Sequence, residues 1–579
     1  MDKNARSLTD PQASLPHAEN PERFTGLRLG EVADVAAGLP AVASSMRHVF
    51  GEMGLARGFN ALLQLNQKEG FDCPGCAWPD PDDERSAIAE YCENGAKAIA
   101  EEATTKTLTP GFFAENSVAS LSELDDFEIG KKGRISQPMY LPPGATHYQP
   151  IEWDDAFALI AGHLNGLASP NEAVFYTSGR TSNEAAFLYQ LFVREFGTNN
   201  LPDCSNMCHE SSGVALSDSL GIGKGSVTLD DFSKAEIILI LGQNPGTNHP
   251  RMLTALQKAT ENGCKIISVN PLPEAGLMGF QNPQEVKGAL GITAPLTELF
   301  LQIRINGDMA LLKGIMKLLL AADRQSGGAV LDHAFIREHT EGYEAFAAGL
   351  DAVSFETVLE GSGLAMEQLQ AAADLIAGKS RIIACWAMGL TQHRNAVETI
   401  QEVVNLLLLK GSIGKPGAGT CPVRGHSNVQ GDRTMGIYEK PGKPFLDKLQ
   451  EVFGFAPPRA EGWDVVESIK AMHSGLGRVF IAMGGNFLSA TPDTLFTAEA
   501  LRRCALTVQV STKLNRSHLV HGREALILPT LGRSDQDRVH GELQFVTCEN
   551  SMGVVQASRG GLTPVSPSCS SGGWRWMRE

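Results

Sequence analysis

A cysteine and a histidine stand side by side at Cys208 and His209, just before a run of small residues. The residues upstream follow an apolar helical pattern, so the pair is expected in a turn that opens into the next helix. The positive end of that helix would favour a thiolate, and the imidazole could carry a proton. A soft anionic sulfur beside a base suits a nucleophile or a ligand for a thiophilic metal. The alternative is a buried cysteine next to a solvated histidine.

A second pair of thiols, Cys73 and Cys76, has the spacing Cys-x-x-Cys in a predicted loop. On spacing alone, this pair fits a redox dithiol, half of a zinc site or half of an iron–sulfur site. No β-α-β pattern surrounds the two cysteines, which disfavours a thioredoxin-like role. The metal alternatives stay open.

The segment after Cys208 predicts a β-α-β unit. An apolar strand at residues 235–241 breaks at Gly242, a helical stretch follows at 252–262, and a second apolar strand lies at 264–270. Both strands end in ligand-type residues, at the edge where open α/β sheets bind ligands. The GxGxxG fingerprint of ordinary dinucleotide sites is absent. Strands and helices alternate from about residue 150 to about residue 545, which predicts an α/β fold around parallel sheets.

Composition narrows the class of protein. A chain of 579 residues is too long for one compact core, so several subdomains are expected. The net charge of −17 argues against nucleic acid or an anionic membrane as a partner. The 11 cysteines are irregularly spaced, which favours free thiols in a reducing compartment. The first residues carry no twin arginine and no apolar signal region, and no apolar run could span a bilayer, so we expect a cytoplasmic protein.

Several motifs follow one another in a fixed order along about 480 residues: Phe175–Glu184, Cys208-His209, Leu241–Pro245 with His249-Pro250, Trp386–Gln392 and Gly411–Gly431. Each is weak alone, but the ordered set is specific. The chain resembles the large catalytic subunit of molybdopterin oxidoreductases, on the branch of the molybdenum formate dehydrogenases. The form Cys-Pro-Gly-Cys-Ala-Trp-Pro-Asp-Pro, from Cys73, is similar to a less studied formate-dehydrogenase-like subgroup that is linked to acid resistance in some bacteria.

The resemblance implies roles for the residues of the active site. Cys208 matches the cysteine or selenocysteine that ligates molybdenum, and His209 would take the proton released from substrate. Cys204 could be an alternative ligand, but Cys208 occupies the family's ligand position, so we interpret Cys204 as structural. Arg424 matches the arginine that holds the carboxylate of formate; the alternative is an arginine that holds cofactor phosphate. His426 stands where formate-specific enzymes carry glutamine, so the resemblance leaves the substrate open.

The resemblance also implies a [4Fe–4S] cluster in the N-terminal part of the chain. Cys73, Cys76 and Cys92 match three of its four cysteine ligands, whereas Asp80 stands at the expected position of the remaining one. Thiolates are the preferred partners of iron in such sites. The alternative is a loop without a cluster that is stabilised by packing. Lys97 would be the family's basic residue between cluster and pterin, or a solvated lysine.

Glycines and polar residues at successive strand ends would form the cradle for two molybdopterin guanine dinucleotides. Backbone N–H groups freed by glycine, together with amide side chains, suit pyrophosphate and guanine edges; isolated glycines would mean only turns. The predicted cofactor-binding residues are Gly179, Arg180, Asn183, Glu184, Gly242, Asn244, Asn270, Glu274, Lys415, Gly417, Asn428, Gln430, Gly484, Gly485, Asn486, Thr512, Lys513 and Asn515.

By this resemblance the chain divides into four parts. We expect a flexible leader at 1–35, an iron–sulfur-type domain at 36–145, and a molybdopterin-binding α/β region of two interleaved subdomains at 146–550. Residues 551–579 are interpreted as a truncated or aberrant tail. Family members usually continue into a β-barrel-like domain that closes over the pterins. Its apparent absence here is explained by a frameshift, a premature stop or a naturally short form.

The leading hypothesis is a molybdenum bis(molybdopterin guanine dinucleotide) oxidoreductase that oxidises or reduces a small substrate by two electrons. Without a flavin or NAD fingerprint, the electrons would pass through the cluster to a partner protein. A cofactor-maturation sulfurtransferase is a second expected partner. The alternatives are a cofactor-poor, non-catalytic remnant or accessory subunit, and a zinc or thiol redox protein that uses Cys73 and Cys76.

Overall fold

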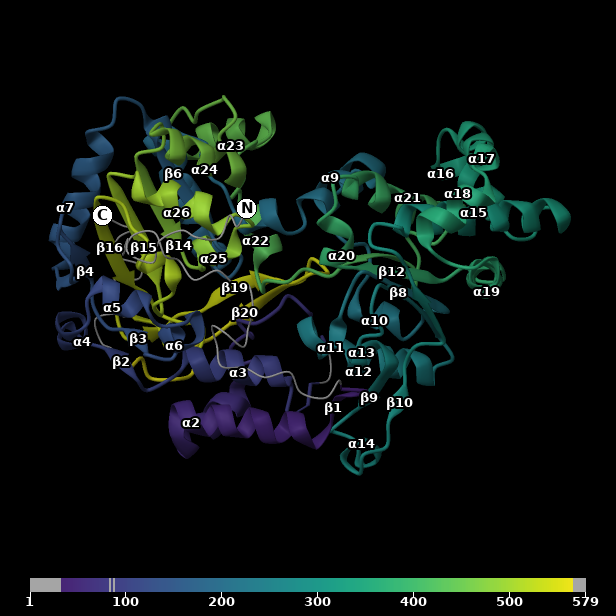
Figure 1. Cartoon of the computed structure of the whole chain (residues 1–579), viewed down its shortest axis with the longest axis horizontal. Helices are drawn as coiled ribbons and strands as arrows, with labels where there is room; N and C mark the ends of the chain where they lie inside the picture. Colours follow the sequence, from purple (N-terminus) through teal and green to yellow (C-terminus); the bar gives the residue numbers. More distant parts are fainter. Residues whose placement is uncertain (1–32, 83–84, 87–88, 566–579) are drawn as a thin grey trace, which may run out of the picture.

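The computed structural model describes residues 33–82, 85–86 and 89–565. The predicted leader therefore lies almost entirely outside the described residues, as does half of the predicted tail. Two sheets in two lobes dominate the molecule, and a pair of short strands lies between the lobes (Figure 1). In the part of the chain that the structure describes, no helix is both long enough and apolar enough to cross a membrane.

The first lobe holds a five-stranded parallel sheet with the order β11-β8-β7-β12-β13. Alternate residues of each central strand enter two different cores: Leu239 faces one and Ile238 the other. Both faces are covered, as the continuous apolar runs of these strands require. The strands are β7 (Ile237–Leu241), β8 (Lys265–Asn270), β11 (Leu299–Gln302), β12 (Ile382–Trp386) and β13 (Gly419–Pro422).

Helices connect the parallel strands of this lobe. The helix α12 (Met252–Glu261) connects β7 to β8, so the predicted β-α-β unit is confirmed to within two residues at each boundary. The other helices of this lobe include α9 (Glu210–Leu220), α15 (Asp308–Gln325), α16 (His333–His339), α17 (Tyr343–Ala352), α18 (Phe355–Ser362), α19 (Met366–Ala377), α20 (Met388–Thr391) and α21 (Ala396–Leu409).

The second lobe holds a six-stranded mixed sheet with the order β5-β4-β16-β15-β14-β6. Its four parallel strands come from two distant parts of the chain: β6 (Ala173–Thr177), then β14 (Val479–Met483), β15 (Leu506–Ser511) and β16 (Glu524–Pro529). The antiparallel strands β4 (Met139–Leu141) and β5 (Gln149–Pro150) complete one edge. The helices around it include α7 (Trp153–Asn165), α8 (Asn183–Phe196), α22 (Val429–Thr434), α23 (Lys443–Phe453), α24 (Val465–Ser474) and α26 (Thr494–Arg502).

The N-terminal part lies below both lobes in Figure 1, where α2 (Gly38–Gln64) packs against α3 (Glu93–Glu102). The loop between these helices carries Cys73 and Cys76, and Cys92 caps the start of α3. The helices α4 (Pro110–Glu115), α5 (Val118–Ser122) and α6 (Asp126–Gly130) then lead into the six-stranded sheet. The cysteine loop is thereby held between two helices and the lobes above it.

After β16, the described residues form two two-stranded ladders. One is β17 (Arg538–Val539) with β18 (Glu542–Leu543), and the other is β19 (Val546–Glu549) with β20 (Val555–Ser558). β19 and β20 are the strands between the lobes in Figure 1. Together with the two large sheets, these elements make a mixed α/β fold, which confirms the predicted class.

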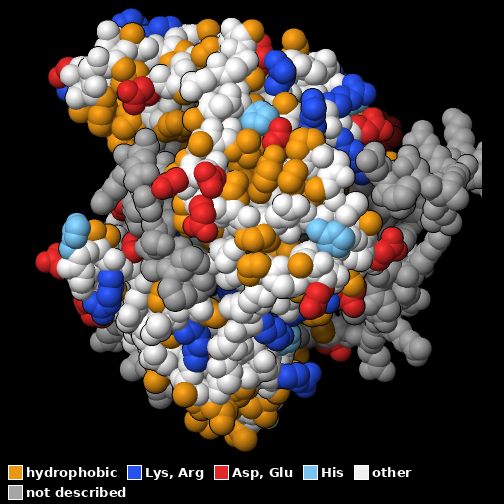
Figure 2. All heavy atoms as spheres, turned by 90° about the vertical axis from the view of Figure 1, so that its left-hand side faces the viewer, with side chains coloured by type: hydrophobic (Ala, Val, Ile, Leu, Met, Phe, Trp, Pro, Cys, Tyr) orange, Lys and Arg blue, Asp and Glu red, His pale blue; other side chains and the backbone are white. Residues whose placement is uncertain are grey.

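On the face of the six-stranded lobe seen in Figure 2, acidic and basic side chains lie interspersed with groups of apolar ones. No part of that view is a continuous basic surface. This face therefore shows no strong field of a single sign.

Candidate functional site

Cys208 lies in the turn between the 3₁₀ helix η2 (Cys204–Met207) and α9, as the sequence predicts. Its side chain is buried, and its Sγ lies 3.5 Å from Sδ of Met388. Burial raises the pKa of the Cys208 thiol, while the charge of Arg424 and a hydrogen bond from the backbone N–H of Gly425 oppose that rise. The structure therefore places the predicted sulfur ligand beside the predicted arginine.

His209 is fully buried, and both of its ring nitrogens are engaged. Nε2 lies 3.1 Å from the carbonyl oxygen of Val423, and Nδ1 lies 2.9 Å from Oγ of Ser212. Trp386 Nε1 donates to the same hydroxyl at 2.9 Å. Burial lowers the pKa of His209 to about 3, so the ring is neutral at physiological pH. To accept a substrate proton, the ring would have to give up one of these hydrogen bonds.

Arg424 follows β13 and is held on several sides. Its Nε donates to Gln430 Oε1 at 2.9 Å, and Nη2 donates to the carbonyl of Gly223 at 3.0 Å. Its backbone N–H donates to Ser551 Oγ, and its carbonyl oxygen lies 2.9 Å from Nε2 of His249. Among the described residues, Nη1 has no hydrogen-bond partner, so one edge of the guanidinium is left for a ligand.

A cavity of about 770 Å³ lies at the carboxyl ends of β6, β14, β15 and β16. Eight of the predicted site residues line it: Arg180, His426, Gly484, Gly485, Asn486, Thr512, Lys513 and Asn515. Arg533 lines it as well. The guanidinium of Arg180 has no hydrogen-bond partner among the described residues, and its like charge opposes that of Arg533. Arg533 pairs with Asp72 at 2.6 Å, so Arg180 is the cation of this pair that favours an anionic ligand in the cavity.

A second cavity, of about 260 Å³, lies at the carboxyl end of the five-stranded sheet. It is lined by Gly242, Pro271, Asp308, Met388 and Gln392, among others. Because Met388 also touches the Cys208 sulfur, this cavity begins one side chain away from the predicted metal ligand. Each parallel sheet thus presents a cavity at the edge where α/β folds bind ligands, and the Cys208 turn lies next to one of them.

Other predicted residues are near these cavities but are satisfied by protein groups. Both carboxylate oxygens of Glu184 accept from Thr547, through its hydroxyl and its backbone N–H. Asn428 donates to Asn183 at 3.0 Å and accepts from the backbone N–H of Glu549. Four of the predicted residues therefore tie β19 to α8 and α22 in this structure: Asn183, Glu184, Asn428 and Gln430.

Gly179 follows β6, and a Cβ there would lie 2.7 Å from the Cys204 sulfur. The other remaining predicted residues divide between the two edges of the five-stranded sheet. Asn244 caps the short helix α11 (Pro245–Asn248) after β7, and Asn270 ends β8 next to the segment of Glu274. Lys415 and Gly417 precede β13, so they lie at the amino edge, and Gly417 N–H donates to Asp231. The structure does not bring these last two residues to either cavity.

The three cysteines of the predicted cluster converge. A Cβ on Gly95 would lie 3.2 Å from the Cys73 sulfur and 3.8 Å from the Cys92 sulfur, and the charges of both Cys73 and Cys76 interact with Cys92. Within the described ranges, however, no group of three or more His, Cys, Asp or Glu side chains is arranged to hold a metal ion. Thiols on separate irons of a cluster need not meet at one point, so this spacing disfavours the zinc alternative more than the cluster.

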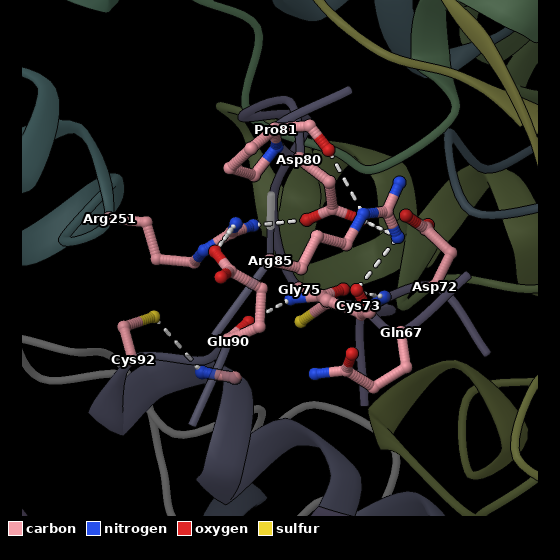
Figure 3. Close-up of polar contacts among 12 residues, drawn as sticks. Gln67, Asp72, Cys73, Gly75, Asp80, Pro81, Arg85, Glu90, Cys92 and Arg251 are labelled. Atoms are coloured by element: carbon pink, nitrogen blue, oxygen red, sulfur yellow. Dashed lines mark hydrogen bonds and ion pairs between the residues drawn. The ribbon is translucent and has the colours of Figure 1, made fainter. Parts of the chain in front are cut away.

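Asp80 and Lys97 are engaged elsewhere. The carboxylate of Asp80 pairs with the guanidinium groups of Arg251 and Arg85 (Figure 3). Lys97 forms an ion pair with Glu93 at 2.6 Å, one turn away on α3, and is partly exposed. The cations closest to Cys73 in the large cavity are instead Arg180 and Arg533.

The residues present fit a dinucleotide-type ligand in the large cavity. His426 Nδ1 and Ser511 Oγ are buried there without a hydrogen-bond partner among the described residues. Gly484 and Gly485 have φ values of +71° and +79°, and a Cβ on Gly484 would lie 2.7 Å from Ser178 Oγ. This wall accepts only glycine and exposes backbone groups, as phosphate cradles do.

Sequence reasoning missed several residues of the site. Met388 and His249 lie in quoted motifs but were not assigned roles, although one touches the Cys208 sulfur and the other holds the Arg424 backbone. Ser551 and Arg533 carried no signal, because each contacts a residue far away in the sequence.

Known proteins share the sequence or the fold of this chain. Residues 134–517 match the molybdopterin oxidoreductase family. An uncharacterized oxidoreductase of Mycobacterium tuberculosis is 59% identical over 536 residues, covering 93% of this chain and 69% of that protein. The F420-dependent formate dehydrogenase 1 subunit alpha of Methanococcus maripaludis is 30% identical over 362 residues, covering 62% of this chain and 50% of that subunit.

Among solved structures, acetylene hydratase from Pelobacter acetylenicus superimposes with a TM-score of 0.58 at 16% identity. The match covers 77% of this chain and 61% of that one, and it shows a likeness of fold alone. Because the family match spans more than half of the chain, the chain belongs to the molybdopterin oxidoreductase family.

Proposed function

We propose that this chain is a molybdenum bis(molybdopterin guanine dinucleotide) oxidoreductase of the formate dehydrogenase type. The observation that supports the proposal most is the position of Cys208: its sulfur lies beside Arg424 and contacts Met388, which lines the smaller cavity. The larger cavity, which Arg180 lines without a hydrogen-bond partner among the described residues, lies at the carboxyl edge of the other sheet. Two such cavities suit two dinucleotides that share one metal.

Different residues of the chain would bind the cofactor and ligate the metal. Arg180, Lys513 and Arg533 would bind pyrophosphate in the large cavity, and Gly484 and Gly485 would let it approach the backbone. Cys208 would supply the thiolate ligand, which a thiophilic metal favours over the protonated thiol. The bound molybdenum would supply the two-electron redox change.

A small anion is the proposed substrate, with formate as the leading candidate. The free Nη1 edge of Arg424 would bind its carboxylate, while Gln430, Gly223 and Ser551 hold the arginine in place. Formate would leave as carbon dioxide after losing one proton and two electrons. His426 faces the large cavity and interacts electrostatically with Arg180, so its proposed role is beside the cofactor.

The electrons would leave through an iron–sulfur cluster to a separate partner protein, and a sulfurtransferase would mature the cofactor. Both partners and a cytoplasmic location remain part of this proposal. The three converging thiols support the electron path.

Metal and pterin analysis of the purified chain tests the proposed function. We expect molybdenum in about equal amount to protein, with two pterins per metal, after expression in a host that makes the cofactor. Zinc alone would identify a thiol or zinc protein, and a metal-free chain would identify a non-catalytic remnant. Either result would overturn the proposal.

A further inference from the structure

We propose that Cys73, Cys76 and Cys92 hold a three-iron cluster, [3Fe–4S], through three thiolates, and that Asp80 is not a cluster ligand. In this structure the fourth corner is closed by a buried network of ion pairs around Arg251. The inference rests on the proposed function only in that it assumes a cluster. It departs from the four-ligand cubane that the family resemblance implies.

Burial raises the pKa of all three thiols, but each sulfur accepts a backbone N–H bond that favours the thiolate form. The backbone N–H of Gly75 donates to Cys73 Sγ at 3.3 Å, and that of Gly95 donates to Cys92 Sγ at 3.4 Å. Cys76 receives a hydrogen bond from the backbone of Trp78. Backbone N–H bonds to cluster sulfurs are a recurring means of stabilising their negative charge. Each of the three cluster thiols thus receives a backbone N–H bond.

The loop that carries these sulfurs is fixed by Asn66. Its side chain accepts from the backbone N–H of Cys73 at 2.8 Å and donates to the carbonyl oxygen of Glu90 at 2.7 Å. Arg85 donates to the Asn66 carbonyl at 2.8 Å and to that of Pro81 at 3.0 Å. The positions of the three thiols are therefore set by bonds that do not depend on a fourth ligand.

Asp80 stands where the remaining thiolate is expected, but its carboxylate is engaged. Oδ1 pairs with Nη1 of Arg251, and Oδ2 lies 3.5 Å from Nη1 of Arg85. The Asp80 side chain is 3% exposed, so its charge depends on these two cations. If Asp80 ligated iron, its buried ion pairs with Arg251 and Arg85 would break. The positive charges of both guanidinium groups would then be less well neutralised.

Arg251 closes the same side of the site. Its guanidinium is shared between Asp80 and Glu90 (Figure 3), and it lies close enough to Cys76 and Cys92 to interact with both charges. An arginine side chain has only donors and stays protonated, so it cannot ligate iron. A fixed cation at this corner also repels a fourth iron ion. The thiolates of Cys76 and Cys92, in contrast, gain from its charge.

Two other occupants of the thiol site fit less well. A single zinc ion needs several ligands at one point, and the described residues offer no such group. The sulfurs of Cys73 and Cys92 both lie near Gly95. A dithiol made only of Cys73 and Cys76 would not explain why Cys92 is also close. A cluster with one iron on each sulfur uses all three thiols.

The electronic state of the cluster provides the test. The full 579-residue chain is purified without oxygen, or is reconstituted with iron and sulfide. Iron is then counted, and electron paramagnetic resonance spectra are recorded in the oxidised and reduced forms. Three ferric ions carry an odd number of electrons, so an oxidised three-iron cluster is paramagnetic. An oxidised cubane with two ferric and two ferrous ions is diamagnetic and gains its signal on reduction. We expect about three irons per chain and a signal in the oxidised form.

Substitutions at position 80 separate a ligand from a counter-ion. Asp80→Asn keeps the size of the side chain and one oxygen that can accept from an arginine, and we expect the same iron count and spectrum as in the parent chain. Asp80→Cys adds a fourth thiol, so we expect a four-iron cluster with about one more iron per chain. Its electron paramagnetic resonance signal should then appear in the reduced form instead of the oxidised form. Cys92→Ser should lose the cluster, whereas Cys264→Ser, at the start of β8, should keep it.

The outcomes are distinguishable. Four irons and a diamagnetic oxidised form in the parent chain would overturn this inference and leave the proposed function intact. A chain that holds molybdenum but no iron after reconstitution would overturn both the inference and the proposed electron path. If Asp80→Asn alone changes the cluster, Asp80 is a ligand and the assignment is wrong. Should Asp80→Cys fail to fold, the spin state of the parent chain still decides.

Discussion

The contact between Cys208 and its neighbours joins residues that are far apart in the sequence. The sulfur meets Met388 from the segment after β12, while Arg424 arrives from the end of β13. Burial opposes a free thiolate here, and only the arginine charge and one backbone N–H favour it. A buried sulfur that is left charged needs a cation or a metal beside it.

Replacing the sulfur should remove activity without harming the fold. In Cys208→Ser we expect molybdenum-linked turnover with an artificial electron acceptor to fall by about a hundredfold or more, because a hard hydroxyl replaces a soft thiolate. The melting temperature should stay roughly unchanged, since the side chains are similar in size. Cys504→Ser, at another buried cysteine, is the matched control and should keep its turnover. Full turnover in Cys208→Ser would rule out the ligand role.

Arg424 offers a test of substrate class. Loss of a desolvated, charge-assisted pair costs a few kcal/mol, so Arg424→Ala should lower kcat/KM for formate by roughly a hundredfold or more. Arg424→Lys should recover only part of this, because a lysine cannot reproduce the planar fork. The exposed Arg324→Ala serves as the control. Equal losses on neutral and anionic substrates would show that Arg424 holds cofactor phosphate.

At the scale of elements, helix α15 begins at a cavity. Asp308, its first residue, is buried and lines the smaller cavity. Burial raises the pKa of Asp308 to about 6, although a backbone N–H and His393 oppose the rise. The folded pKa lies above the unfolded value, so the contribution of this carboxyl to stability is fully present below about pH 3.8. It is lost as the pH rises through about 6.

Asp308→Asn should therefore help the fold more at high pH than at low pH. The shift predicts that the gain in unfolding free energy, relative to the parent chain, grows by about 1.4 kcal/mol from pH 5 to pH 7.5. Thermal melts of both proteins across this range measure the trend. The exposed Asp374→Asn is the control and should show no such trend. A difference that shrinks as the pH rises would contradict the assignment.

The sequence predicts individual helices and strands better than it predicts which residues of different elements come into contact. The strands β7 and β8 and the helix α12 were recognisable because apolar runs and Gly242 act locally. Lys415 and Gly417 show the limit, since a glycine turn looks the same at either edge of a sheet. The pairing of Asp80 with Arg251 had no sequence signal, because nothing local links the two residues. The proximity of Cys208 to Arg424 was expected only through family resemblance.

At the scale of the whole molecule, the two cavities belong to different sheets: His426, two residues after Arg424, lines the larger one, and Met388, which touches the Cys208 sulfur, lines the smaller one. Asn428, Glu184 and Gln430 fasten β19 between the lobes without help from a ligand. A ligand that fills both cavities would add contacts to both lobes at once. Stability of the whole chain should therefore depend on the cofactor.

Cofactor removal is the corresponding prediction. A chain produced in a host that cannot make molybdopterin should melt lower than the loaded chain by about 3 °C or more, as binding at a hundred times the dissociation constant adds about 2.7 kcal/mol. Calorimetry and limited proteolysis of the two preparations measure the difference. Identical melting of chains with and without bound pterin would mean that the cofactor does not bridge the lobes.

The order of strands in the six-stranded sheet affects how the protein folds during its synthesis on the ribosome. β6 ends at Thr177, but its partner β14 begins only at Val479. At about 5 to 20 residues per second, β6 must wait roughly 15 to 60 seconds for that partner to be synthesised. During this interval its apolar residues have no sheet to join, and long-range parallel pairing is slow even afterwards. Chaperones that shield nascent chains should therefore govern how much of this enzyme a cell obtains.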